Sequence, residues 1–157
     1  MIHIDSSTQI SRPRDEVFDF ITNVDNLPKW QSGVVQSKRL SDGAVRVGFQ
    51  YEEIVKVGPW RLNAVCTVTD VKANERFAFV AKSRGPLDYD GRFDLQPVSG
   101  GTRLTISGVA RLKGIWRLMQ PVLAGDLQKE TRTELATIKL LLEAEAGPTV
   151  DERTLTV

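Results

Sequence analysis

The chain has very few of the side chains that build disulfides, metal centres and catalytic triads. Cys66 is its single cysteine, and His3, near the start, is its single histidine. One cysteine excludes an intramolecular disulfide and a cysteine-rich metal cluster, and one histidine argues against a zinc site or a histidine-dependent triad. We therefore expect no metal, no cofactor, and a protein of the reducing cytoplasm.

Net charge is also nearly absent, because 21 basic residues face 20 acidic ones and leave a formal charge of +1. No overall field would hold a nucleic acid, so we expect none as a partner. No apolar run approaches the ~18 residues of a membrane span, and the first residues lack the pattern of a signal peptide. We expect neither export nor stable membrane insertion, and the oligomeric state stays open between monomer and homodimer.

The first thirty residues predict a strand and two short helices. A β-branched, alternating run covers Ile2–Ile10. A helix is expected over Pro13–Thr22, with Ser11 as its cap, because proline suits the first turn and acidic residues complement the helix dipole. The stretch Asn23–Trp30 adds an Asx-type start and an early proline, which predicts one or two further turns.

The middle of the chain predicts an antiparallel meander. Six β-type runs are separated by turn residues such as Ser41-Asp42-Gly43 and Ser99-Gly100-Gly101. Connections this short join antiparallel neighbours, since a parallel crossover needs a dozen or more residues. The runs are Val34–Leu40, Val45–Val57, Trp60–Val71, Arg76–Ser83, Leu87–Val98 and Thr102–Lys113.

The C-terminal part predicts one long amphipathic helix over Ile115–Ala146, with apolar residues at three- and four-residue steps. Pro121 and Gly125 should bend or loosen its first third. A glycine and a proline then end the helix. The expected organisation is one domain over residues 1–146 and a polar, mobile tail over residues 147–157.

Alternation assigns the two faces of the sheet. In the run Leu87–Leu95 the odd positions are apolar or glycine, and the even positions are Asp88, Asp90, Arg92 and Asp94, which must face water. The three aspartates resemble a metal cluster in composition only, so we interpret them as a solvated face. Gly91 and Gly108 on the inner face should leave room for a cavity.

Glu53 falls on the inner register between Tyr51 and Val55, where an unpaired carboxylate would be costly. It could be a ligand anchor or a general acid/base. The simpler interpretation is a bulge between Glu52 and Glu53 that turns Glu53 to the surface and Ile54 inside, because bulges are common in curved sheets.

The order of these elements resembles the helix-grip fold of the SRPBCC superfamily, which includes START-like domains, polyketide cyclases/dehydratases and lipid-transport-like proteins. The resemblance is carried by the segment from Ser11 to Ile21 (SRPRDEVFDFI), by Asn26-Leu27-Pro28-Lys29-Trp30, and by the helical ending Ile138–Glu143. It implies an α+β fold in which a curved antiparallel sheet of six to seven strands wraps around the long C-terminal helix. These motifs contain no catalytic residue.

Three functions follow as hypotheses. The first is a noncatalytic binder or carrier of a hydrophobic small molecule, such as a lipid, isoprenoid, polyketide or aromatic compound. The second is a cyclase/dehydratase-like enzyme, in which Glu53 with Tyr51 or Tyr89 moves protons. The third is a protein-interaction module, which would leave a small pocket and an exposed apolar patch. The candidate ligand-binding residues are Phe49, Tyr51, Glu53, Cys66, Phe79, Tyr89, Phe93, Ile106, Trp116, Met119, Leu123 and Leu127.

Overall fold

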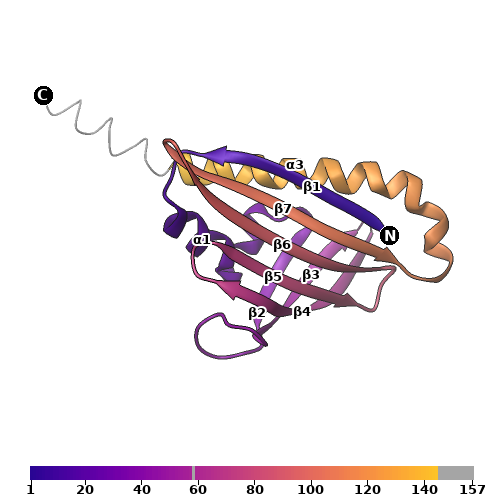
Figure 1. The fold of residues 1–157 in the computed structure, drawn as a ribbon. Helices are drawn as coiled ribbons and strands as arrows, with labels where there is room; N and C mark the ends of the chain where they lie inside the picture. Colours follow the sequence, from indigo (N-terminus) through magenta and orange to yellow (C-terminus); the bar gives the residue numbers. More distant parts are fainter. Residues whose placement is uncertain (58, 145–157) are drawn as a thin grey trace, which may run out of the picture.

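The computed structural model describes residues 1–57 and 59–144, and Figure 1 shows their arrangement. The predicted C-terminal tail, and the last two residues of the predicted helix, lie outside the described residues. In chain order the elements are β1 (Ile2–Ile10), α1 (Arg14–Thr22), the 3-10 turn η1 (Val24–Asn26), α2 (Leu27–Trp30), β2 (Val34–Arg39), β3 (Gln50–Val57), β4 (Trp60–Lys72), β5 (Arg76–Ser83), β6 (Leu87–Val98), β7 (Gly101–Leu112), the 3-10 segment η2 (Gly114–Met119) and α3 (Gln120–Ala144).

The strands form one antiparallel sheet in the order β1-β7-β6-β5-β4-β3-β2. Strands β2 to β7 pair with their neighbours in sequence, as the short turns predict. The first strand then joins the far edge beside β7, with Ile2 opposite Ala110 and Ile10 opposite Thr102. The meander is confirmed, and the sheet has seven strands.

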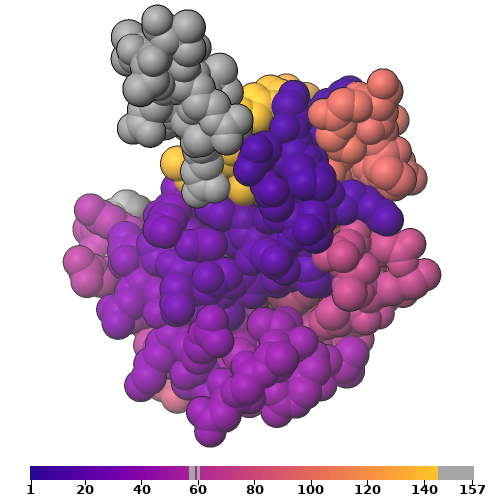
Figure 2. Space-filling model, turned by 90° about the vertical axis from the view of Figure 1, so that its left-hand side faces the viewer, coloured from indigo at the N-terminus to yellow at the C-terminus, as the bar shows by residue number. Residues whose placement is uncertain are grey.

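The long helix α3 lies along the side of the sheet formed by β1 and β7 (Figure 1). Its buried face carries Thr131, Leu135, Ile138 and Leu142 at three- and four-residue steps. The short helices α1 and α2 cover one end of the concave face, where Figure 2 shows the indigo-to-purple N-terminal residues on the surface. A seven-stranded antiparallel sheet with this long C-terminal helix is the helix-grip fold that the resemblance implied.

Two local expectations are wrong. The third predicted strand does not begin at Val45, because residues 45–49 form a turn in which the Phe49 N–H donates to the Arg46 carbonyl at 3.0 Å. Gly48 has a φ of 89°, which favours glycine, and the strand starts only at Gln50. Ser11 is not a helix cap either. Pro13 is the residue before the first turn of α1, and the Ser11 N–H donates to the Glu143 carboxylate instead.

The start of the C-terminal helix is not the bent α-helix that the sequence predicted. Residues Gly114–Met119 wind as a 3-10 helix, and the regular α-helix begins at Gln120. Pro121 therefore lies in the first turn of α3, where its missing N–H costs no hydrogen bond. Within residues 1–57 and 59–144, no helix combines the length and the hydropathy that crossing a bilayer would require.

Candidate functional site

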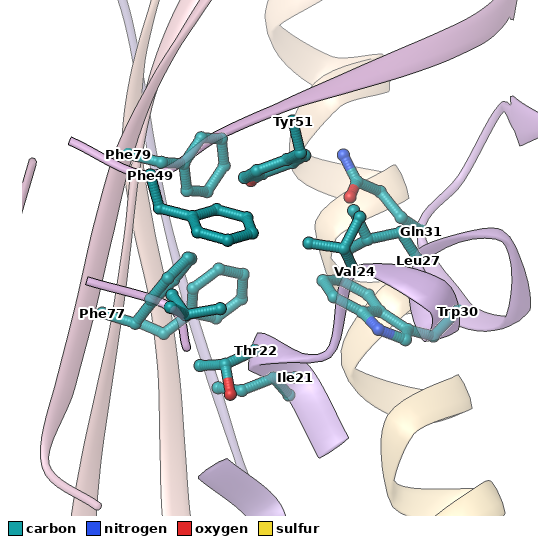
Figure 3. Close-up of a pocket in the computed structure, with 12 residues that line it drawn as sticks. Ile21, Thr22, Val24, Leu27, Trp30, Gln31, Phe49, Tyr51, Phe77 and Phe79 are labelled. Atoms are coloured by element: carbon teal, nitrogen blue, oxygen red, sulfur yellow. The ribbon is translucent and has the colours of Figure 1, made fainter. Parts of the chain in front are cut away.

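One end of the concave face is a filled aromatic core. Phe77 and Phe79 from β5 and Phe49 from the turn before β3 meet Trp30 from α2, and Figure 3 shows these rings converging on a small void. Trp30 packs edge-on against Phe93, with ring centroids 5.9 Å apart. The space open to the centre of a water molecule is about 10 Å³, so the void holds one water at most. This end is a packed core and not a receptacle for a ligand.

The other end of the concave face has a floor of small side chains. Ala64, Cys66 and Ala81 lie side by side on β4 and β5, because Cys66 pairs with Ala81 in the ladder and Ala64 with Ser83. The inward side chains beyond them are only half-buried. They are Leu62 on β4, Leu87 and Tyr89 on β6, and Leu123 and Leu127 on α3. Solvent therefore reaches Ala81 and these half-buried side chains, whereas Ala64 and Cys66 are buried, and α3 packs mainly on β1.

Glu53 stands between these two ends and is buried, with 3% of its surface exposed. The expected bulge between Glu52 and Glu53 is wrong, since β3 and β4 pair without interruption from Tyr51 to Val57. The irregularity lies instead between Val34 and Gln36 of the neighbouring strand β2. Because the bulge belongs to β2, the register of β3 is unchanged and its carboxylate stays inside.

The carboxyl group of Glu53 is poorly satisfied. Its Oε2 accepts a hydrogen bond from Gln31 Nε2 at 3.5 Å, whereas Oε1 is buried without a partner. Burial disfavours the charged form and raises the pKa of Glu53 to about 7, although the polar neighbours Gln31 and Cys66 oppose the shift. At neutral pH this group is therefore poised between acid and base.

A second carboxyl group, Glu134 on α3, points into the same interior from the opposite wall. Its Oε1 accepts a hydrogen bond from the Ser32 N–H at 3.0 Å. Burial, together with the charges of Glu130 and Glu53, raises the pKa of Glu134 to about 8. Sequence reasoning missed this residue. Its spacing could have identified it, because Glu134 follows Thr131 by three residues and therefore lies on the same side of the helix as the buried residues.

Three further polar groups lie close to Glu53 or Glu134. Burial raises the pKa of Tyr51 well above its usual range, and the neighbouring Cys66 and Glu53 add to the shift. Burial and Glu53 also raise the pKa of the Cys66 thiol, so this cysteine is a small buried side chain and not a thiolate nucleophile. Burial and Glu134 raise the pKa of Tyr89 to about 12. All three stay neutral at physiological pH.

Tyr89 fills the space that the inner glycines were expected to leave open. A Cβ atom on Gly108 would lie 2.2 Å from the Tyr89 hydroxyl, and one on Gly91 would lie 2.8 Å from the Tyr89 ring. The expectation that these glycines enlarge a cavity is therefore wrong. They allow the tyrosine ring to lie flat over β6 and β7, beside Phe79.

The remaining candidate residues fall into three groups. Phe93 and Ile106 are buried in the aromatic core, and Leu123 and Leu127 pack beside Ile2, Ile4 and Leu112. Trp116 and Met119 lie on η2 with 44% and 42% of their surface exposed, so they do not reach the interior. Their neighbours Ile115, Leu118 and Val122 are more exposed still. A role of any of these residues in ligand binding stays a prediction.

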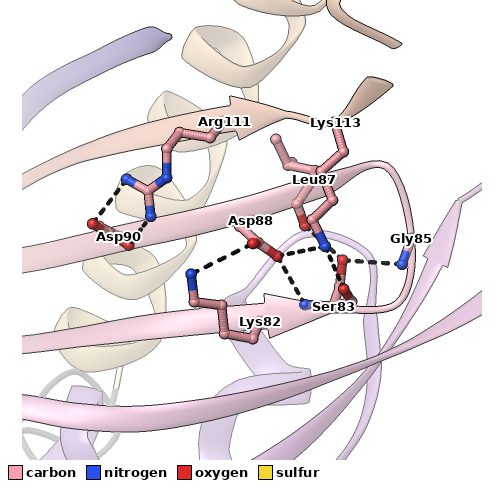
Figure 4. A network of polar contacts seen from close by, with 8 residues as sticks. All are labelled: Lys82, Ser83, Gly85, Leu87, Asp88, Asp90, Arg111 and Lys113. Carbon is pink, nitrogen blue, oxygen red and sulfur yellow. Dashed lines mark hydrogen bonds and ion pairs between the residues drawn. The ribbon is translucent and has the colours of Figure 1, made fainter. Parts of the chain in front are cut away.

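The outer face of the sheet carries paired charges, as its alternation predicted. Arg111 donates to both oxygens of Asp90, at 2.6 and 3.0 Å, and Lys113 contacts Asp88 at 2.9 Å (Figure 4). Burial alone would raise the pKa of Asp88, but the hydrogen bonds from Lys113 and the Ser83 N–H lower it. Asp94 pairs with Arg92. Asp88 and Asp90 form ion pairs with Lys82 on β5 and Arg111 on β7, so they tie β6 to both of its neighbours, whereas Asp94 and Arg92 lie on the same strand.

Comparison with known proteins identifies solved structures of the same fold and the family of this chain. Solved structures of proteins from Chromobacterium violaceum and Thermus thermophilus share the fold, with TM-scores of 0.70 and 0.78. Their sequences are 20% and 13% identical to this one. The alignments cover 91% and 92% of this chain and 99% of each of the other two chains. A conserved protein from Geobacillus kaustophilus is 18% identical, with a TM-score of 0.77 over 91% of this chain and 96% of its own.

No curated protein matches the sequence. At these identities the solved structures show the fold alone. The family model described as "Polyketide cyclase / dehydrase and lipid transport" matches residues 1–143, which is nearly the whole of the described chain. The chain therefore belongs to the polyketide cyclase / dehydrase and lipid transport family.

Proposed function

We propose that the protein binds a hydrophobic small molecule, such as a lipid, isoprenoid, polyketide or aromatic compound, at the open end of its concave face. The apolar part of the ligand would lie on the floor of Ala64, Cys66 and Ala81. The first half of α3 would cover it, and its polar end would reach Glu53. The family covers both lipid transport and cyclase/dehydrase chemistry, and the proposal takes the first of these.

The observation that carries this proposal is the contrast between the two ends of the interior. Around Phe49, Phe77 and Trp30 the space is filled to within one water molecule. Around Ala81 the inward side chains are small or half-buried, although a sheet face of this kind is normally covered. A ligand that covers these half-buried apolar side chains removes their surface from water, which favours binding by about 25 cal/mol for each Å² of apolar surface.

Filling the floor should abolish binding. We expect an Ala81→Leu variant to lose at least about tenfold in affinity for Nile red, an uncharged apolar dye, because the larger side chain occupies the ligand's place. Ala78→Leu is the matched control, since Ala78 lies on the same strand at an even position, three residues away on the outer face. Dye fluorescence titration measures both. Native mass spectrometry of the purified wild-type protein, followed by extraction, would identify a retained ligand.

Equal dye affinity in both variants would contradict a site on this floor. Loss of affinity in both, with an unchanged thermal midpoint, would point to binding on the outer face. Either result would remove the proposed location of the ligand.

An enzymatic function is the second candidate, and one observation favours it. The cyclase/dehydratase hypothesis requires Glu53 inside and near a tyrosine, and Glu53 is buried, with a charge that affects Tyr51. A carboxyl group with a pKa of about 7 can both donate and accept a proton at neutral pH. Glu53→Gln would then abolish turnover of a bound polyketide while leaving its affinity within about threefold. Unchanged turnover would rule out this role.

The interaction hypothesis has less support. The exposed apolar side chains of η2 meet one of its two conditions, an exposed patch. The second condition, an interior without room for a ligand, is met around the aromatic core. Over the small-residue floor, the half-buried inward side chains support ligand binding instead. We therefore place ligand binding first.

A further inference from the structure

The interior holds two carboxyl groups and, among the described residues, no cation that pairs with either. Glu53 projects from the sheet and Glu134 from α3, and the two are tied to consecutive residues of one short segment. Gln31 donates its side-chain N–H to Glu53, and Ser32 donates its backbone N–H to Glu134. The buried carboxyl group of Glu53 and the half-buried one of Glu134 therefore lie on either side of this segment, one from the sheet and one from α3.

The groups that surround this acidic pair (Glu53 and Glu134) come from several elements, and Ser37 on β2 lies opposite Glu53 in the ladder. The others are Gln31 and Ser32 after α2, Tyr51 on β3, Cys66 on β4, Tyr89 on β6, and Glu130 on α3. None of them carries a positive charge. The ion pairs within residues 1–57 and 59–144 involve neither Glu53 nor Glu134.

The unsatisfied atom within this space is an acceptor. Glu53 Oε1 is buried and has no hydrogen-bond partner, although a buried polar group is normally paired. An orphaned carboxylate oxygen lacks a donor, and a second carboxylate nearby strengthens the preference for a positively charged one. Leaving such a group unpaired costs free energy, which a ligand with the right donor would recover.

We propose that the preferred ligand is an apolar molecule that carries a basic nitrogen, whose ammonium group donates hydrogen bonds to Glu53 and Glu134. This inference rests on the proposed function and narrows it to one chemical class. An ammonium group offers three N–H donors and one positive charge, which suits two carboxylates on opposite walls. An alcohol offers one donor without charge. A fatty acid would bring a third acidic group into the same apolar space, so it should bind worst.

Three probes of equal chain length test this order of affinities. Dodecylamine, 1-dodecanol and dodecanoate would each compete with Nile red at pH 8, below their aggregation concentrations. We expect the amine to displace the dye at a concentration at least about tenfold lower than the alcohol, and dodecanoate to be the weakest. In a Glu53→Gln/Glu134→Gln double variant the amine and the alcohol should differ by less than about threefold.

The matched control is Glu52→Gln, next to Glu53 but on the opposite face of β3, where it accepts a hydrogen bond from Asn63. This variant should keep the wild-type preference for the amine. Thermal denaturation of each variant verifies that it is folded.

Two failures can be told apart. If neither the dye nor any of the three probes binds the wild-type protein, the proposed function itself is wrong. If the alcohol binds but the amine is no tighter, or if the double variant keeps the preference, the inference about the basic nitrogen is overturned while ligand binding stands.

Discussion

A Glu53→Gln variant should be more stable than the wild-type protein at pH 8 and about equally stable at pH 4. In the folded protein the pKa of Glu53 is about 7, against an ordinary value of 4.5. Between these two values the folded state keeps a proton that the unfolded chain has released. The stability that this group contributes is therefore complete below about pH 4.5 and is lost as the pH rises to about 7.

The size of the effect follows from the same two pKa values. Each tenfold change in proton affinity corresponds to about 1.4 kcal/mol, so the difference between 4.5 and about 7 sets an upper limit of about 3 kcal/mol on the variant's gain in unfolding free energy at pH 8. Glutamine keeps the shape of the protonated acid and can still accept from Gln31. Urea denaturation at pH 4, 6 and 8 measures the difference between variant and wild type.

Two further variants make this prediction specific. Glu134→Gln should show the same sign, with its window extended to about pH 8, because that is where the folded-state pKa of Glu134 lies. Glu52→Gln, on the opposite face of β3, should keep the wild-type pH dependence. A Glu53→Gln variant that is no more stable than wild type at any pH would show that this carboxyl group is hydrated in the folded protein.

Gly101→Ala should destabilise the fold by about 3 kcal/mol, the upper end of the cost of overpacking. A Cβ atom at this position would lie 2.0 Å from the Ile10 carbonyl oxygen and 3.0 Å from the Ser11 Cα. Both are backbone atoms of the segment that leaves β1, so no side-chain rotation relieves the clash. Because Gly101 begins β7, the pairing of the first strand with the sheet must shift.

Gly125→Ala is the matched comparison and should have the opposite sign. A Cβ atom on Gly125 would meet nothing within 4 Å, and the residue lies inside α3. Alanine is favoured over glycine in a helix by about 1 kcal/mol, so this variant should be more stable by about that amount. Thermal or urea denaturation measures both variants. A Gly101→Ala variant with wild-type stability would mean that β1 leaves the sheet by another path.

The elements themselves could be read from local patterns. The first strand, α1 and the strands of the meander from Trp60 onward lie within a residue or two of their predicted bounds. Alternation on β6 placed Asp88 and Asp90 outside correctly, because successive side chains of a strand point to opposite faces whatever lies far away. Short turns determined the antiparallel order for the same local reason.

Errors arose where a local pattern had two solutions. Val45, Val47 and Phe49 alternate like a strand, yet a turn at Gly48 removes them from the ladder, and Val47 is exposed. Glu53 was expected to turn outward through a bulge in β3. The bulge formed in β2 instead, and nothing in the residues around Glu53 distinguishes these two positions.

The site depended on distant parts of the chain. Glu134 shares the buried face of α3 by its spacing, but only the packing of α3 against the sheet places it opposite Glu53 and beside Ser32. Gly91 and Gly108 left space in principle, and the ring of Tyr89 from a neighbouring position occupies it. The volume of a cavity is the small difference between the space that the backbone encloses and the volume of the side chains that fill it, so it cannot be predicted from single residues.

The amino-acid order by itself determined the elements, their antiparallel sequence and the apolar face, since each depends on residues within a few positions of one another. Tertiary structure alone decided which end of that face is filled by aromatic rings, which end keeps a floor of Ala64, Cys66 and Ala81, and that two carboxyl groups meet inside. Those features depend on where α3 and the short helices settle, and this is set by side chains that lie far apart in the chain, such as Ser32 and Glu134.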